Sequence, residues 1–186
     1  MGFNLVNVGH EERMTHCKQL RQTSRQAGSY FNKMFHAGDL YNQWLEIAFF
    51  YVPDDVLDEL KDRLLIISNT QRDACRVPRS LVKDREIIFL SERIMPKQGA
   101  DSGQPKARYF IFCVLHEVAH ALKKHLSPTW DNLTREQNEQ QEAEADNLAL
   151  SWFNARVRAN ANPYELEMTR EEIKEQEAYF RELMRK

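Results

Sequence analysis

The sequence predicts an α+β protein, a mostly helical single domain that contains a small sheet. Its 186 residues are enough for one domain with a hydrophobic core and short for two. Apolar residues recur at helical spacing in several segments of the chain. Between these segments lie short apolar runs rich in β-branched residues, which are typical of strands. We therefore expect one domain over residues 1–186.

Residues 1–38 are polar, and we expect them to be helical with loose ends. His10, His16 and His36 are scattered through this segment. An isolated histidine is rarely a metal ligand, so these three are expected to lie on solvated surface. The core of the domain is accordingly predicted in residues 39–186.

Two helices are predicted between residues 39 and 64. Each begins at an aspartate that can cap it, Asp39 or Asp54, and Pro53 separates the two helices. Each has an apolar stripe, which predicts burial along one side. The first stripe consists of Leu40, Trp44, Ile47 and Tyr51, and the second of Val56, Leu57, Leu60 and Leu64.

A small sheet is predicted after these helices. The β-branched content rises in Leu65–Ser68, and Arg85–Ser91 (REIIFLS) is a short apolar run of the kind found in strands. The segment Met95–Lys106 contains two prolines and two glycines, which predict an exposed loop.

Three further helices are predicted after the loop. The first covers Ala107–His125 and is mostly apolar, which indicates a buried central helix, and Pro105 suits its first turn. A capping box at Thr134 and Gln137 opens a long helix that ends near Arg158. The same pattern recurs at Thr169 and Glu172 before a last helix, whose apolar residues are Ile173, Phe180, Leu183 and Met184.

The composition excludes several classes of protein. A net charge of −2 provides no cationic field, so no nucleic acid is predicted as a partner. The longest apolar run, Tyr109–Leu115, is far shorter than the roughly 18 to 20 residues of a membrane-spanning helix, so no membrane association is expected. The first residues lack a secretory signal, and three widely spaced cysteines indicate no disulfide framework. We expect a reducing, cytoplasmic setting.

The central helix contains His116-Glu117-Val118-Ala119-His120, which fits the pattern H-E-x-x-H. Two imidazoles four residues apart share one helix face, and both can reach one zinc ion at roughly 2.0 to 2.1 Å. Glu117 is turned about 100° away, so its carboxylate can take a proton from a metal-bound water. Without partners these groups would each cost about 1 to 3 kcal/mol to bury. The alternative is that both histidines bind backbone carbonyls and that Glu117 faces solvent.

A catalytic zinc also needs a third protein ligand and an open fourth position. A third histidine in the metzincin pattern would require Gly at Lys123 and His at Leu126, so that pattern is excluded. The long helix presents Glu142 and Asp146 on one face, whereas Glu144 points elsewhere. One of these two carboxylates can complete the site, and the other can accept the spare N–H of a liganding histidine. Three small residues would let the two helices approach closely: Ala143, Ala145 and Ala149. The alternative is an ordinary hydrated helix face.

The pattern His116-Glu117-x-x-His120 followed by Glu142-x-x-x-Asp146 resembles the gluzincin arrangement of thermolysin-like zinc metallopeptidases. The Glu-Ala-Glu-Ala-Asp context is similar to HtpX-type peptidases, as is His125. The run from Ile87 to His116 resembles the strand and active-site helix of ImmA/IrrE-like peptidases. The resemblance covers about Ile87 to Phe153.

This resemblance implies a zincin-like fold, in which the H-E-x-x-H helix packs on the small sheet, with the metal site on residues 105–158. It implies that the zinc ligands are His116, His120 and Glu142. It further implies that Glu117 is the general base and acid and that Asp146 orients a liganding histidine.

The expected activity is hydrolysis of peptide bonds in a peptide or protein substrate by zinc-activated water, with Glu117 moving the proton. An oxyanion donor is also required, and the candidates are Tyr109, His125, or a His or Tyr of the N-terminal region. His125 equally suits a helix C-terminus, where the macrodipole favours it. Two alternatives stay open. One is a non-catalytic zinc-binding regulatory or interaction protein with a metallopeptidase-like fold, and the other is a helical interaction protein with an accidental H-E-x-x-H.

Overall fold

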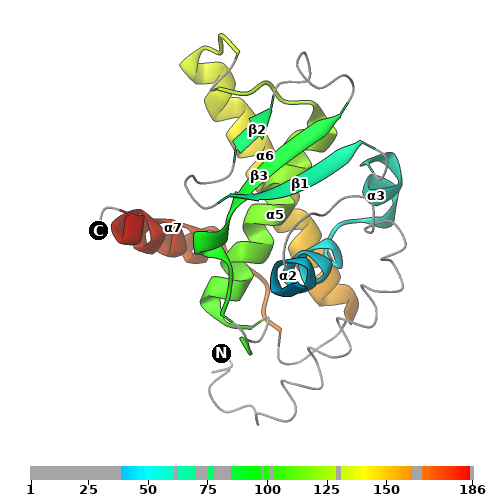
Figure 1. Cartoon of the computed structure of the whole chain (residues 1–186), viewed down its shortest axis with the longest axis vertical. Coiled ribbons are helices and arrows are strands. Elements are labelled where there is room, and N and C mark those ends of the chain that lie inside the picture. Colours follow the sequence, from blue (N-terminus) through cyan, green and yellow to red (C-terminus); the bar gives the residue numbers. More distant parts are fainter. Residues whose placement is uncertain are drawn as a thin grey trace.

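The computed structural model describes residues 39–60, 63–69, 75–77, 85–97, 99–100, 103–128, 131–160 and 165–184. The polar segment 1–38, for which helical structure was expected, lies outside these residues. Figure 1 shows the arrangement of the described elements.

Two short helices, α2 (Asp39–Phe49) and α3 (Asp54–Leu60), precede the strands β1 (Leu64–Asn69), β2 (Cys75–Val77) and β3 (Glu86–Ser91). A 3-10 turn, η3 (Glu92–Ile94), then leads to three long helices: α5 (Pro105–Lys123), α6 (Arg135–Asn160) and α7 (Arg170–Met184). The prediction of a mostly helical α+β chain with a small sheet is thus confirmed. None of the helices in the described part of the chain is both long and apolar enough to cross a bilayer.

The sheet has three strands in the order β1-β3-β2. β1 runs parallel to β3, with Leu64 opposite Glu86, and β2 runs antiparallel to it. Along β3 the side chains of Ile88 and Leu90 are fully buried, whereas their neighbours Ile87 and Phe89 are partly exposed. This alternation follows from the period of two in a strand, and it directs one face of the sheet into the core. Strand β2 was not predicted, because three residues are too few to show such alternation.

Leu64 lies in β1, although the sequence analysis placed it in the stripe of the second helix. Helix α3 ends at Leu60, where the amide of Arg63 donates to the Leu60 carbonyl oxygen at 2.9 Å and turns the chain. Leu64 is buried in the strand beside Glu86. A spacing of four residues after Leu60 fits a helix, but the local turn ends that helix first.

The first helix also ends earlier than its apolar stripe predicted. Tyr51 lies beyond the end of α2, in a turn that the Tyr51 amide closes on the Ala48 carbonyl at 3.0 Å. The side chain remains buried, because the Tyr51 ring stacks on Phe153 of α6 and the hydroxyl donates to Glu165. Asp39, expected as a cap, is the first described helical residue of α2.

Helix α5 is the central element of the fold. It packs against α2, α6 and the strand β3, and Figure 1 shows it running behind the sheet with α6 alongside. Pro105 is its first residue, so the loop expected over Met95–Lys106 ends before Pro105 and follows η3. The core joins residues from all these elements, including Trp44, Ile88, Phe110 and Phe153. Each of them is at most 2% exposed.

Both predicted capping patterns are present, but only the first is a complete box. The Thr134 amide donates to the Gln137 side chain at 3.0 Å, and the Gln137 amide donates to the Thr134 hydroxyl at 3.2 Å. At α7 the Glu172 amide donates to the Thr169 hydroxyl at 3.1 Å. The Glu172 carboxylate, however, binds Arg108 instead of returning to Thr169.

Arg108 ties α7 to the central helix. Its side chain is buried, and its guanidinium donates to both carboxylate oxygens of Glu172, from Nε at 2.6 Å and from Nη2 at 2.9 Å. It also donates to the backbone carbonyl oxygen of Leu166 at 2.8 Å. A buried guanidinium is tolerated only when its donors are paired, so this bidentate contact fixes where α7 docks.

Replacing Glu172 by Gln should therefore destabilise the fold. The substitution keeps the size of the side chain but leaves the buried charge of Arg108 without its counterion, which should lower the free energy of unfolding by about 1 to 3 kcal/mol. Urea unfolding followed by circular dichroism measures the change. Glu171→Gln on the exposed side of α7 is the matched control, and equal stability of the two variants would contradict the assigned role of Arg108.

Candidate metal centre

The candidate site lies where α5 and α6 pack side by side (Figure 1). His116 and His120 are one helical turn apart on α5, and Glu142 is on α6. Close approach of the helices is possible because Ala145 and Ala149 of α6 are fully buried in the contact region. Ala143, which was expected to contribute as well, is exposed.

Three ligand-type atoms converge between the two helices. The Nε2 atoms of His116 and His120 are 2.9 Å apart. The carboxylate of Glu142 spans both rings, with Oε2 at 3.3 Å from His116 Nε2 and Oε1 at 3.5 Å from His120 Nε2. Ligand atoms of these three residues lie within 4.8 Å of one another. The structure thus brings together the two histidines and the glutamate that the sequence analysis selected.

The spacing of these atoms suits a small tetrahedral ion. Zinc ligands at roughly 2.0 to 2.1 Å in tetrahedral geometry are about 3.3 Å from one another. The separations of 2.9, 3.3 and 3.5 Å bracket that value. Two imidazole nitrogens and a carboxylate oxygen also form a donor set that zinc accepts. These three residues could therefore hold a divalent ion without rearrangement of the helices.

Asp146 determines which nitrogen of His116 faces the centre. Its Oδ1 lies 2.9 Å from Nδ1 of His116. An ionised carboxylate only accepts hydrogen bonds, so Nδ1 of His116 carries a proton and donates it. In the neutral ring Nε2 then carries no proton and can bind a metal at the centre.

The electrostatics of the site favour a positive charge at its centre. Burial by itself would lower the pKa of His116, but hydrogen bonds to Asp146 and Glu142, with the charges of Glu117 and Glu142, raise this pKa to about 10. Hydrogen bonds to His116 and His120 hold the pKa of Glu142 well below its ordinary value, although its partial burial opposes this shift. The raised pKa of His116 and the lowered pKa of Glu142 have the same cause. A positive charge between these groups, whether a proton or a metal cation, is stabilised.

Glu117 is not one of the three residues whose ligand-type atoms converge. Its side chain is buried, in contrast to the alternative in which it faces solvent. Its charge contributes to the raised pKa of His116, so the carboxylate is near that ring. Glu117 is thus buried near the ring of His116 but lies outside the group of three ligand-type residues.

His125 was predicted either as an oxyanion donor or as a helix-terminal histidine, and it lies just past the C-terminus of α5, where its side chain has two further contacts. Its Nδ1 lies 2.8 Å from Nδ1 of His120, and its Nε2 lies 3.3 Å from Oε2 of Glu144. Glu144 also pairs with Lys123 at 2.8 Å. Glu144 does point away from Glu142 and Asp146, as predicted, and hydrogen bonds to Lys123 and His125 lower its pKa.

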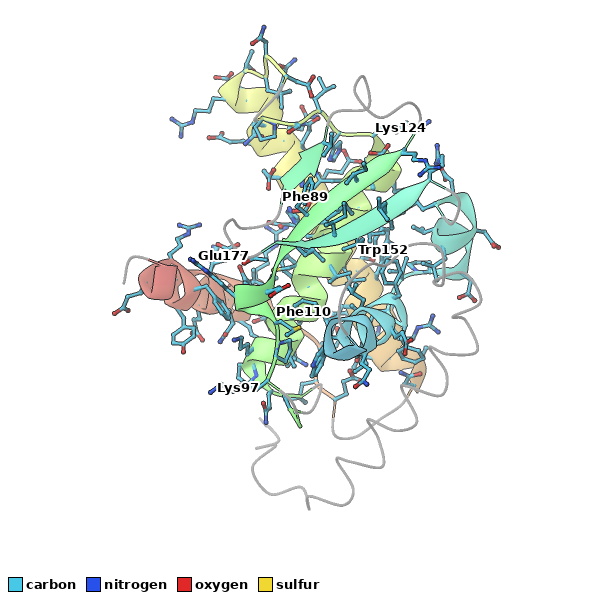
Figure 2. The ribbon with its side chains drawn as sticks, viewed as in Figure 1. Phe89, Lys97, Phe110, Lys124, Trp152 and Glu177 are labelled. Atoms are coloured by element: carbon cyan, nitrogen blue, oxygen red, sulfur yellow. The ribbon has the colours of Figure 1, made fainter. Side chains whose placement is uncertain are left out.

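The end of α5 explains why His125 faces His120. The helix was expected to continue to His125 but ends at Lys123, because Lys124 adopts the left-handed conformation with φ of 58°. The amide of Lys124 donates to the Ala121 carbonyl at 3.3 Å, and that of His125 donates to the His120 carbonyl at 3.1 Å. Figure 2 shows Lys124 at one end of α5 and Phe110 near the other. This turn is usually made by glycine, so the sequence carried no signal for it.

Tyr109, the other described oxyanion candidate, is engaged elsewhere. Its ring stacks on Phe180 of α7, with ring centroids 5.0 Å apart. Tyr109 also precedes His116 by two helical turns, which corresponds to about 10 Å along the helix axis. The N-terminal candidates lie outside the described residues.

Replacing Lys124 by Gly should stabilise the protein. A residue with a Cβ atom in the left-handed region costs roughly 1 kcal/mol relative to glycine, and helices commonly end on glycine in this conformation. The expected result is a higher Tm, measured by differential scanning calorimetry, with Lys123→Gly as the control because that residue is still helical. A lower Tm for Lys124→Gly would contradict the left-handed turn that positions His125.

Comparisons with known proteins do not assign a family. No family model, no curated protein and no solved structure matches this chain.

Proposed function

We propose that this protein is a zinc-dependent metallopeptidase of the gluzincin type, built on a zincin-like fold. One observation carries the proposal. Nε2 of His116, Nε2 of His120 and the carboxylate of Glu142 converge within 4.8 Å, and Glu117, which follows His116 in the helix, is buried. The packing of the H-E-x-x-H helix α5 against β3 supports the zincin-like fold.

In this proposal His116, His120 and Glu142 hold the zinc ion. Two histidines and one glutamate are a ligand set of catalytic zinc sites, in which the fourth position is left for water or substrate. About half of the Glu142 side chain, 46%, is exposed, so the carboxylate side of the site is open to solvent. Asp146 keeps the His116 ring in the tautomer that ligation requires, through the bond at 2.9 Å.

Peptide hydrolysis would use the residues as follows. Bound zinc would lower the pKa of a coordinated water and polarise the scissile carbonyl. Glu117 would take a proton from the attacking water and deliver it to the leaving amine. Its burial keeps the carboxylate away from bulk solvent, so that the proton is passed to the substrate. Peptides or proteins are the proposed substrates.

We also propose a cytoplasmic setting. The three cysteines are odd in number and widely spaced, which is unlike a disulfide framework. Cys113 of α5 forms no disulfide in the described part of the chain.

The first expected outcome concerns the metal. The purified wild-type chain should retain about one zinc per molecule after dialysis, and His116→Ala should lose it, because one of three protein ligands is removed. Elemental analysis measures the content. Glu175→Ala, which removes an exposed carboxylate of α7, is the control. Equal zinc content of wild type and His116→Ala, or a wild type that binds none, would contradict the ligand assignment.

The second expected outcome concerns the base. Glu117→Gln should keep the zinc and should lower the rate of peptide cleavage by roughly 100- to 10,000-fold, because the proton acceptor is lost. Cleavage of a peptide library, read by mass spectrometry, provides the measurement. Glu139→Gln, on the exposed first part of α6, should cleave like wild type. A zinc-loaded wild type that cleaves nothing would instead favour the non-catalytic zinc-binding regulatory or interaction protein.

A further inference from the structure

We propose that His125 is a positioning residue of the zinc site, which orients His120 through a hydrogen bond on the side of the ring away from the metal. Glu144 anchors His125 in turn. The inference rests on the proposed function, since it assigns a role relative to the zinc ligand His120. It concerns metal affinity and does not make His125 a ligand or a group that touches substrate.

The three side chains form a continuous chain of contacts. Nδ1 of His120 lies 2.8 Å from Nδ1 of His125, and Nε2 of His125 lies 3.3 Å from Oε2 of Glu144. The two rings meet edge to face, at an interplanar angle of 76°. The side chains of His120 and His125 are 4% and 7% exposed, so water competes little for the bond between them.

The positions of the protons in the contacts His120–His125–Glu144 follow from the carboxylate of Glu144. Glu144 can only accept, so Nε2 of His125 carries a proton and donates it. In the neutral ring Nδ1 of His125 is then an acceptor, and it takes the N–H from Nδ1 of His120. The remaining nitrogen of His120, Nε2, then carries no proton and can bind a metal held between it, Glu142 and His116. The contacts therefore select the tautomer of His120 that binds a metal.

The two liganding rings are thus held by two carboxylates of the same helix. Asp146 reaches His116 directly, whereas Glu144 reaches His120 through the ring of His125. Glu144 and Asp146 are two residues apart and project in different directions from α6, so each faces a different end of the site. Partners that orient liganding histidines typically contribute about 10- to 100-fold in metal affinity.

Lys123 provides a matched control for this arrangement. It pairs with Oε1 of Glu144 at 2.8 Å, while Oε2 of Glu144 lies nearest His125. Both members of the Lys123–Glu144 pair are 42% exposed, and exposed ion pairs contribute little to stability. Replacing Lys123 by Gln should remove the ion pair and leave the contacts of His125 in place.

The test compares two substitutions of His125 that separate hydrogen bonding from packing. His125→Phe keeps an aromatic ring without nitrogen, whereas His125→Asn loses the ring but retains an acceptor near the position of Nδ1. Zinc affinity of the full chain is measured by competition with a chromophoric chelator. We expect His125→Phe to bind zinc roughly 10- to 100-fold more weakly than wild type. We expect His125→Asn and Lys123→Gln to remain within roughly threefold of it.

A second readout checks the tautomer without any activity assay. Long-range proton–nitrogen NMR spectra of the zinc-loaded wild type should show the His120 proton on Nδ1 and the metal on Nε2. Circular dichroism of each metal-free variant should show that the substitutions leave the helices intact. A His120 ring protonated on Nε2 would overturn the inference.

The outcomes distinguish this inference from the proposed function. A wild type that binds no zinc contradicts the proposed function. If the wild type binds zinc while His125→Phe binds it equally well, the role of His125 is wrong and the zinc site stands. A weak His125→Asn beside a tight His125→Phe likewise overturns the inference, because packing and not the hydrogen bond would then be responsible.

Discussion

The close packing of α5 against α6 is the constraint on which the candidate site depends. Two of the three converging groups are one turn apart on α5, so their spacing follows from the helical repeat alone. The third, Glu142, reaches within 3.5 Å of both rings only because α6 approaches α5 closely. Ala145 and Ala149, which have no exposed surface, permit this approach. A bulkier residue at either position would move the carboxylate away from both imidazoles.

Helix α6 also supplies the groups that orient the site, since the carboxylates of Glu142, Glu144 and Asp146 contact different atoms of the α5 region. Glu142 faces both Nε2 atoms, Asp146 holds Nδ1 of His116, and Glu144 holds His125. In the neutral ring of His116 the single proton therefore lies on Nδ1, toward Asp146, and Nε2 is left for a metal at the centre. An accidental H-E-x-x-H on a solvated helix face would not require such partners. This convergence supports metal binding, which is common to the proposed peptidase and to the non-catalytic zinc-binding alternative. The role of Glu117 distinguishes these two functions.

Long-range contacts also decided several local features of the fold. Glu172 occupies the position of a capping-box glutamate, yet its carboxylate contacts Arg108, which precedes it by 64 residues in the chain. A buried guanidinium without a counterion costs more free energy than an incomplete cap, so the long-range pair prevails. Leu64 and Tyr51 fit the helical periodicity of the segments before them but lie beyond the ends of those helices. Both remain buried, so periodicity correctly indicated burial and misplaced the ends of the helices.

The sequence by itself determined the α+β class, most of the helices, the strands around residues 64–69 and 86–91, and the pairing of H-E-x-x-H with Glu142 and Asp146. These features depend on local spacing, which a helix or strand converts directly into a common face. Only the tertiary structure decided the strand β2, the contact of Glu172 with Arg108, and the position of His125 beside His120. The position of His125 requires Lys124 to adopt the left-handed conformation, which is usually adopted by glycine. Such features depend on partners distant in the chain, and their stabilisation arises only when the helices have packed.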